Sequence, residues 1–220
     1  YTTKRRGRIK NMLFTSACFL ATITCVLMLM VLIWNIIVQG KDWLSWGFID
    51  HLPSRFPHKA GIKSALWGSI WLISLTAMFS VPLGVGAAVY LEEYAPRSRW
   101  RKLIQLNIAN LAGVPSIVYG ILGLGLFVRA LSLERSVLSG ALTLTLVVLP
   151  IIILASQEAL RAVPDSIRRS AYALGATRWQ TVWYQVLPAS LPGIMTGVIL
   201  SLSRALGEAA PLIAVGAMAY

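Results

Sequence analysis

The sequence predicts an all-α protein that crosses a lipid bilayer several times. Of its 220 residues, 57% are hydrophobic and only 13% are charged, and the mean hydropathy is +0.71. Soluble domains do not carry such a share of apolar side chains. The apolar residues also gather in runs of about 20 or more, the length that a helix needs to cross a hydrocarbon core of roughly 30 Å.

Five such runs occur, and each is expected to be a transmembrane helix, because hydrocarbon offers no partner to the polar backbone groups of an open strand. The runs span residues 12–38, 64–91, 103–128, 136–155 and 189–220. The first run follows a basic segment, residues 1–11, but it is too long for the core of a cleavable signal peptide. We therefore expect it to remain as an anchor, followed by a core region over residues 64–220.

The positive charge is interpreted as a topology signal. The formal net charge is +12, and connections rich in basic residues alternate with connections poor in them. The rich connections hold Lys4, Arg5, Arg6, Arg8, Lys10, Arg97, Arg99, Arg101, Lys102, Arg161, Arg168, Arg169 and Arg178. By the positive-inside rule these connections face the cytoplasm, and the N-terminus with them. Because the charges follow topology, nucleic acid is not expected as a partner.

The cysteines and histidines indicate no site. Cys18 and Cys25 lie seven residues apart on one expected helix, too far apart along its axis to form a disulfide. His51 and His58 lie in the connection between the first two runs, without the spacing of a metal site. No metal is therefore expected.

The connection over residues 159–188 has the most specific pattern. We expect two short helices separated by Gly175, a residue suited to the left-handed conformation that ends a helix. Asp165 is expected to cap the first helix, and Thr177 with Gln180 to form a capping box for the second. Pro188 is expected to stop the second helix. The alternatives are an interfacial hairpin that only joins two spans and a DNA-binding helix-turn-helix. The latter fails because basic residues are few and membrane spans lie close at both ends.

Breaks and charges within the apolar runs indicate a substrate path. The break at Gly113, Pro115 and Ser116 would free backbone N–H groups that could face an anion. Arg204 and Glu208 lie four residues apart, about midway along the fifth run, where exposing an arginine to lipid is costly. We interpret these five residues as the substrate pathway. The alternative is that Arg204 and Glu208 pair only structurally.

The 159–188 connection resembles the EAA loop of permeases in bacterial ABC importers. In that pattern EAA is followed by three residues, Gly, nine residues, Ile, one residue and Leu-Pro. The sequence matches the pattern at Ala171, Gly175, Leu187 and Pro188, and departs from it at Arg169, Ser170 and Gln185. Three further stretches resemble the phosphate permeases of the PstA type: AVYLEEYAP at 88–96, NIANLAGVPSIVYGILGLGLFVRAL at 107–131 and SLSRALGEAAPLIAVGA at 201–217.

This resemblance implies the ABC importer permease (MetI-like) fold with six spans, so the chain, with five visible, is expected to be truncated at its end. It implies a multi-pass subunit of the bacterial cytoplasmic (inner) membrane that translocates inorganic phosphate. The implied partners are a second homologous permease, two ATP-binding cassette subunits and an external phosphate-binding protein. The implied ATPase-coupling residues are Arg169, Ala171, Gly175, Ala176, Leu187 and Pro188.

Several functions remain open from the residues alone. The sequence has no GxxxxGK[ST] motif, so we expect a transport subunit that is not an enzyme and binds no cofactor, with ATP and Mg on partner ATPase subunits. Molybdate or sulfate is an alternative to phosphate. A secondary transporter driven by an ion gradient, with Arg204 and Glu208 as a proton-linked pair, is the alternative mechanism. A structural assembly protein is a third possibility.

Overall fold

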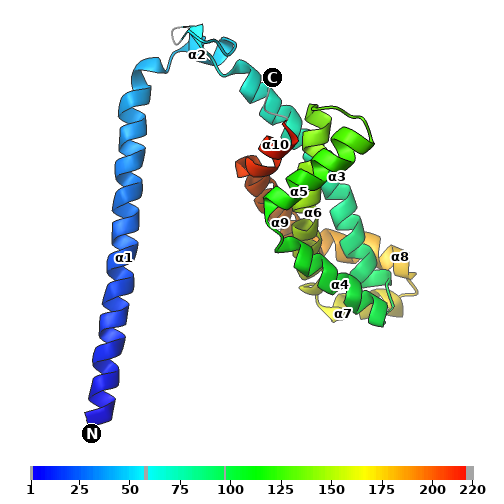
Figure 1. The fold of residues 1–220 in the computed structure, drawn as a ribbon. Helices are drawn as coiled ribbons and strands as arrows, with labels where there is room; N and C mark the ends of the chain where they lie inside the picture. The colour runs from blue at the N-terminus through cyan, green and yellow to red at the C-terminus, as the bar shows by residue number, and fades with distance from the viewer. Residues whose placement is uncertain (1, 57–58, 97, 217–220) are drawn as a thin grey trace. The chain divides into compact units, whose positions relative to one another are not determined.

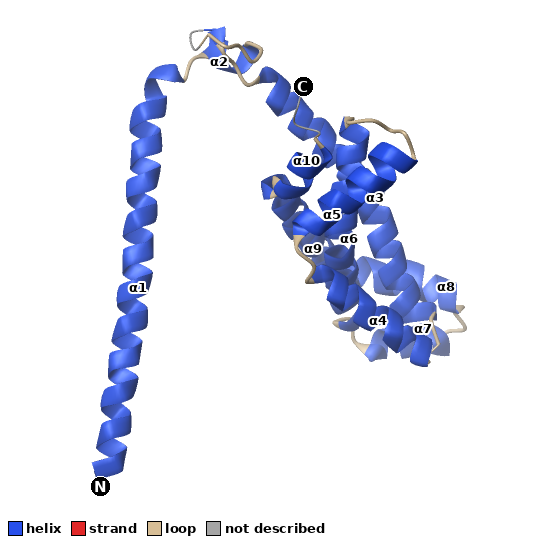
Figure 2. Cartoon of the chain, in the orientation of Figure 1, coloured by secondary structure: helices blue, strands red, loops and turns tan. Residues whose placement is uncertain are grey.

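The computed structural model of the chain describes residues 2–56, 59–96 and 98–216, and only the backbone of residues 2–10. Within these ranges every regular element is a helix and no strand occurs (Figure 2), which confirms the all-α prediction. The chain divides into two units, Tyr1–Ser64 and Ala65–Tyr220. In the described ranges four helices are long and apolar enough to cross a membrane, and the number is five if a bent pair of helices is counted as one span.

The first unit is dominated by one long helix, α1 (Thr2–Gly40) (Figure 1). Its apolar side chains are exposed within the unit along the candidate span Asn11–Trp43, as expected of a helix surrounded by lipid. A 3₁₀ turn, Lys41–Trp43, and the short helix α2 (Trp46–Asp50) follow. Lys63 Nζ lies 2.6 Å from Asp50 Oδ1, and this hydrogen bond lowers the pKa of the exposed Asp50 carboxyl.

The second unit packs around α6 (Val137–Arg161), the most buried of the candidate spans. Ser136 and Ser139 form a capping box at its start. Its buried side chains, Leu144, Val148, Ile152 and Leu160 among them, face the neighbouring helices α9 (Leu187–Gly207), α5 (Ser116–Gly123) and α4 (Arg99–Ala112). The helix extends beyond the predicted run 136–155, because Gln157 and Arg161 near its end are bonded to the carboxylate of Glu92.

Two predicted runs prove to be broken. Instead of one helix over 103–128, α4 and α5 meet at a bend of 99°, with α5 continuing into a π-helical turn, Leu124–Ala130. The reason is Pro115, which has no N–H to continue the α4 ladder. The described part of the run 189–220 is also not one helix: α9 ends at Gly207, Glu208 is extended, and the short helix α10 (Ala210–Val215) follows. The last four residues of the run, 217–220, lie outside the described residues.

The predicted coupling loop differs in two details. Pro188 does not stop the second helix, because α8 (Arg178–Thr181), a π-helical turn (Val182–Val186) and α9 form one continuous stretch. The π-helical turn bonds each residue to the fifth one along, which relieves the clash that proline causes in a regular α-helix. Asp165 does not cap α7 (Asp165–Ala173); Pro164 occupies the cap position, and Asp165 lies in the first turn.

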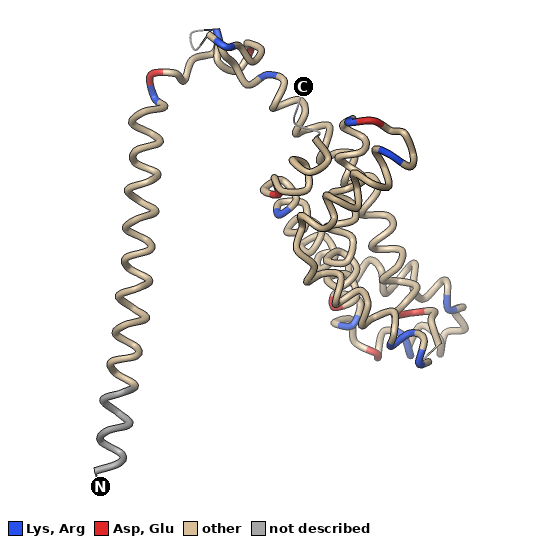
Figure 3. The backbone as a smooth tube through the Cα atoms, in the orientation of Figure 1, with Lys and Arg blue, Asp and Glu red and all other residues tan. Residues whose placement is uncertain are grey.

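Helix α3 (Lys63–Val89) contains Pro82 and ends in another π-helical turn, Tyr90–Tyr94. Gly84 on α3 packs so closely against Ile152 on α6 that an added Cβ would lie 2.6 Å from that side chain. Figure 3 shows that many charged residues of the second unit lie around α7, α8 and the first turn of α4. The fold thus gathers the ends of α3, α4 and α6 with the short helices α7 and α8 at one charged end of the unit.

Candidate functional site

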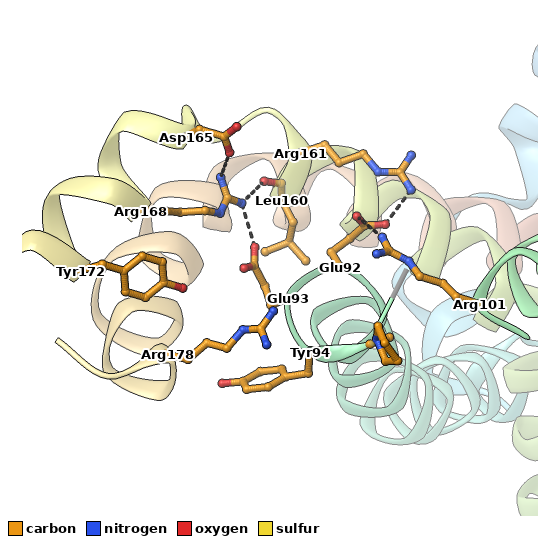
Figure 4. Close-up of a pocket in the computed structure, with 12 residues that line it drawn as sticks. Glu92, Glu93, Tyr94, Arg101, Leu160, Arg161, Asp165, Arg168, Tyr172 and Arg178 are labelled. Carbon is orange, nitrogen blue, oxygen red and sulfur yellow. Dashed lines mark hydrogen bonds and ion pairs between the residues drawn. The ribbon is translucent and has the colours of Figure 1, made fainter. Parts of the chain in front are cut away.

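A cavity of about 550 Å³ lies at this charged end (Figure 4). Its walls come from the turn after α3, the first turn of α4, the end of α6 and the helices α7 and α8. The charged residues that line it are Glu92, Glu93, Arg101, Arg161, Asp165, Arg168 and Arg178. These side chains come from segments far apart in the sequence, so the cavity is a junction between the membrane helices and the loop over 162–181.

Glu92 lies at the centre of one half of this junction. Its carboxylate accepts hydrogen bonds from Arg161 Nη2 at 2.6 Å, Arg101 Nη2 at 2.9 Å and Gln157 Nε2 at 3.0 Å, with Gln105 Nε2 at 3.5 Å. The Glu92 side chain is only 10% exposed. A carboxylate withdrawn from water needs several donors to offset its lost hydration, and charged donors are the strongest. Glu92 therefore joins the end of α3 to both α4 and α6.

Glu93 lies at the centre of the other half. Its Oε1 accepts a hydrogen bond from Arg168 Nη2 at 2.8 Å, and the two side chains are 8% and 16% exposed. The Arg168 guanidinium also donates to the carbonyls of Leu160, at 2.9 Å, and Val163, at 2.7 Å. Backbone carbonyls at the end of a helix lack partners within the helix, and here one arginine supplies them. Arg168 thus attaches α7 to the ends of both α3 and α6.

The local sequence explains why two neighbouring glutamates serve different partners. They lie in the π-helical turn Tyr90–Tyr94, where the Ala95 N–H closes a wide turn on the carbonyl of Tyr90 at 2.8 Å. Pro96 follows and cannot continue the helix. Successive side chains on a helical turn point in different directions. Glu92 consequently faces α4 and α6, whereas Glu93 faces α7.

The charges of the cavity are mostly matched in pairs. Three of its four arginines, Arg101, Arg161 and Arg168, already contact carboxylates. Arg178 instead lies over the ring of Tyr94, with its Cζ 5.6 Å from the ring centroid. A site that must hold a free anion would need an excess of unpaired donors. The arrangement is better suited to holding together the five segments that form the cavity walls, namely the turn after α3, α4, α6, α7 and α8.

The predicted coupling residues lie in α7, in the turn after it and at the start of α9. Gly175 has φ +82°, which confirms the predicted left-handed residue, and Thr177 with Gln180 forms the predicted capping box. Ala171 and Ala176 line a smaller cavity of about 210 Å³. Arg169 and Pro188 are exposed, and Leu187 packs against the core around α6 and α9.

Apolar side chains protrude from the same loop. Leu174 is 89% exposed, and Trp179 and Trp183 stack with ring centroids 5.5 Å apart while remaining more than half exposed. Exposed aromatic and aliphatic groups of this kind are typical of a surface that a partner covers. The predicted role of this loop in ATPase coupling stays a prediction.

The predicted substrate-pathway residues form two groups. Gly113, Pro115 and Ser116 lie at the bend between α4 and α5, where the N–H groups of Gly113 and Val114 donate to carbonyls of α4. Those two donors are therefore not free, contrary to expectation, because they close the last turn of that helix.

Arg204 and Glu208 are brought together at the end of α9. Arg204 Nε lies 3.4 Å from Glu208 Oε1, and the side chains are 58% and 19% exposed. Because α9 ends at Gly207, the pair does not lie midway along one helix as expected. Within residues 98–216, no hydrogen bond or ion pair links this pair to the bend at Gly113. Their common role in a pathway stays a prediction.

Sequence reasoning assigned no role to Glu92, Glu93 or Arg168. A signal was present: the two glutamates make up two of only eight acidic residues in the chain and directly follow a long apolar run. Adjacent acids at the end of a membrane helix are costly unless paired. Their partners could not be chosen, because Arg161 and Arg168 lie 69 and 75 residues further along the chain.

Residues 80–219 match a family described as binding-protein-dependent transport system inner membrane component. The chain is 36% identical over 214 residues to the phosphate transport system permease protein PstA 1 of Mycobacterium tuberculosis (strain ATCC 25618 / H37Rv), covering 94% of this chain and 68% of that protein. It is 34% identical over 205 residues to the phosphate transport system permease protein PstA of Yersinia pestis, covering 90% and 68%.

The fold is also similar to that of a solved structure. A chain in inward-facing conformations of the MetNI methionine ABC transporter superposes with a TM-score of 0.59 at 19% sequence identity. The match covers 64% of this chain and 68% of the other. At this identity the likeness concerns the arrangement of helices alone, and it confirms the predicted permease fold.

Proposed function

The chain belongs to the family of binding-protein-dependent transport system inner membrane components, and from this we propose that it is the permease subunit of an ATP-driven importer of inorganic phosphate. The observation that carries the proposal is the 36% identity over 94% of the chain to a phosphate transport system permease protein. The membrane-spanning helices and the permease fold supply the structure that such a subunit needs.

The proposed assembly follows from what the chain does not contain. Its sequence has no phosphate-binding loop for ATP, so hydrolysis of ATP with Mg is assigned to two separate ATP-binding cassette subunits. A second, homologous permease and an external phosphate-binding protein complete the proposed complex. We assign the complex to the bacterial cytoplasmic (inner) membrane. The basic connections support a cytoplasmic position for the N-terminus and for the 162–181 loop.

We assign the loop around α7 and α8 to the contact with the ATPase subunits. Leu174, Trp179 and Trp183 offer it an exposed apolar surface, and amphipathic helices commonly bind in a partner's groove. Gly175 sets the direction of α8 relative to α7, because a left-handed residue reverses the chain after α7. Ala171 and Ala176 keep the inner side of the loop free of bulk.

We assign Arg204 to phosphate. A guanidinium is always charged and can donate to two oxygens of a tetrahedral anion at once. The 3.4 Å separation from Glu208 and the 58% exposure of Arg204 leave most of its donors available, while Glu208 holds its position. The bend at Gly113, Pro115 and Ser116 provides the broken helix that transport paths contain near the middle of the membrane.

The test uses the complete complex in proteoliposomes, with radiolabelled phosphate outside together with the binding protein, and ATP at the cytoplasmic face. We expect uptake that requires ATP, is blocked by vanadate and is not displaced by excess molybdate or sulfate. Displacement by either oxyanion would assign a different substrate. Uptake driven by a pH gradient without ATP would contradict the proposed mechanism and favour a secondary transporter.

The role of Arg204 is tested in the same vesicles. Arg204→Gln should assemble yet lose uptake. Arg129→Gln changes another exposed arginine of a membrane segment, and this control should assemble and keep its uptake. Reversing the pair, Arg204→Glu with Glu208→Arg, keeps neutrality but moves the cation by about one turn, or 5.4 Å. A packing pair would tolerate this reversal. Uptake close to the unmodified rate in either Arg204 variant would remove Arg204 from the phosphate path.

A further inference from the structure

The contacts of Arg168 single out one connection between the cytoplasmic loop and the membrane helices. Arg168 lies on α7, and its guanidinium bonds to Glu93 at 2.8 Å and to the carbonyls of Leu160 and Val163. The backbone already joins α7 to α6 through Ala162, Val163 and Pro164. The bond to Glu93, by contrast, reaches a helix end that is 75 residues distant in sequence.

Burial distinguishes this bond from the other ion pair of Arg168. Asp165, on the first turn of the same helix, is 78% exposed, and its carboxylate lies 3.5 Å from Arg168 Nη1. Such an exposed pair exchanges readily with water and contributes little. Glu93 is 8% exposed, so separating it from Arg168 leaves a carboxylate with little access to water. The Glu93–Arg168 bond is consequently the one that resists displacement of α7.

The neighbouring glutamate extends this connection into the bundle. Glu92 is bonded to Arg101 on α4 and to Arg161 on α6, at 2.9 and 2.6 Å. A displacement of α7 therefore acts through Glu93 on the turn Tyr90–Tyr94. The preceding residue in that turn, Glu92, is bonded to α4 and α6. Ion-pair networks of this kind carry energetic coupling between distant elements when they have discrete arrangements.

We propose that Glu93 and Arg168 are positioning residues that transmit movement of α7 to the end of α3, so that the ATPase cycle reaches that membrane helix. The proposal rests on the proposed function, because it needs partner ATPases that move the cytoplasmic loop. It adds to that function a specific connection, in which neither residue touches phosphate or ATP. A pair needed only for folding would not respond to changes made after assembly, and this difference defines the test.

The test replaces the ion pair with a removable covalent bridge. In a background with Cys18→Ser and Cys25→Ser, the variant Glu93→Cys with Arg168→Cys is assembled into the full complex with binding protein in lipid vesicles. The ratio of ATPase rates with and without phosphate-loaded binding protein should fall about tenfold, the usual size of a coupling effect. A bifunctional methanethiosulfonate linker should then restore the ratio, and a reducing agent should abolish it again. A monofunctional reagent of equal size should not restore it.

Two further variants decide the remaining outcomes. Glu158→Gln removes an exposed carboxylate that lies 2.9 Å from Arg161 and lines no part of the cavity; it should leave the ratio unchanged. Glu93→Gln is isosteric and keeps the two carbonyl bonds of Arg168, so it should assemble even where the double cysteine variant does not, with the same loss of ratio.

The proposal is overturned if the linker fails to restore the ratio, or if assembled Glu93→Gln retains it. Failure of both variants to assemble would assign the pair to folding and likewise overturn the proposal. The unmodified complex separates this result from the proposed function. If that complex shows no phosphate-dependent stimulation at all, the proposed function has failed, whereas normal stimulation with an indifferent Glu93→Gln refutes the positioning role alone.

Discussion

Replacement of Glu92 by glutamine tests how far the buried ion pairs hold the second unit together. The substitution keeps the shape of the side chain but removes its charge, and it turns an amide NH₂ toward donors that need an acceptor. The contacts affected most are those to Arg161 at 2.6 Å and Arg101 at 2.9 Å. Each hydrogen bond to a charged group contributes about 1.5–3 kcal/mol.

The two bonds together would give about 3–6 kcal/mol, but the lower end applies. Arg161 is 46% exposed, so water can replace part of what it loses, whereas Arg101 is 16% exposed and is left nearly uncompensated. We therefore expect a loss of about 3 kcal/mol, at the low end for a broken buried pair. For a unit of this size that corresponds to a fall of about 6–12 °C in the midpoint of thermal unfolding.

The midpoint is measured on the purified complex in lipid nanodiscs, from the fraction of fluorescent permease that stays in the complex peak after heating. Glu158→Gln is the matched control, because Glu158 also pairs with Arg161, at 2.9 Å, but is 73% exposed. An exposed pair contributes about 0–1 kcal/mol, so its midpoint should hardly change. Equal shifts in the two variants would refute the reasoning, since burial would then have no bearing on the strength of these pairs.

Three further predictions concern other features. Gly175→Val forces a β-branched residue into a left-handed conformation, which costs about 1 kcal/mol or more. Phosphate uptake should therefore fall, although the protein still inserts into the membrane. Normal uptake together with normal ATPase stimulation would show that this segment is only a linker. Gly120→Ala places a Cβ 2.7 Å from Ala214 Cβ and 2.8 Å from Pro211 Cα, so the free energy of unfolding should fall by about 1–3 kcal/mol. A Cβ at Gly125 would have no atom within 4 Å, so Gly125→Ala should leave the thermal midpoint unchanged. A cysteine at Ser54 should react with an impermeant thiol reagent in intact cells and one at Ser98 should not; labelling of the latter from outside would reverse the topology.

The fold was predictable wherever a single local property decides it. Long apolar runs indicate membrane helices because the bilayer leaves no other way to pair the backbone. Gly175 and the Thr177–Gln180 box were predictable for the same reason, since their conformations depend on neighbours within four residues. The continuity of the helix through Pro188 was not. The continuity depends on the π-helical turn that precedes Pro188, and no sequence pattern within Val182–Val186 predicts such a turn.

The site was less predictable because its bonds join distant segments. Arg168 was counted only as part of a basic connection, and its contact with Glu93 depends on a tertiary arrangement that brings α7 to the turn after α3. The expectation that Asp165 caps α7 failed because Pro164 occupies that position. Conversely, the pairing of Arg204 with Glu208 was inferred from a spacing of four, and that spacing brings them within 3.4 Å even though Glu208 lies just beyond the helix.

The unbroken helical stretch from Arg178 to Gly207 has a mechanical consequence. Its 30 residues form a rod about 45 Å long. The stacked Trp179 and Trp183 lie near one end and Arg204 near the other. A tilt of only about 5°, pivoting at Trp179, would move Arg204 by about 3 Å, roughly the length of a hydrogen bond. On the proposed function, a small rotation imposed on the loop around α7 and α8 is enlarged with distance along this helix, and it moves Arg204 toward or away from a tetrahedral anion without any change in the arginine's own rotamer.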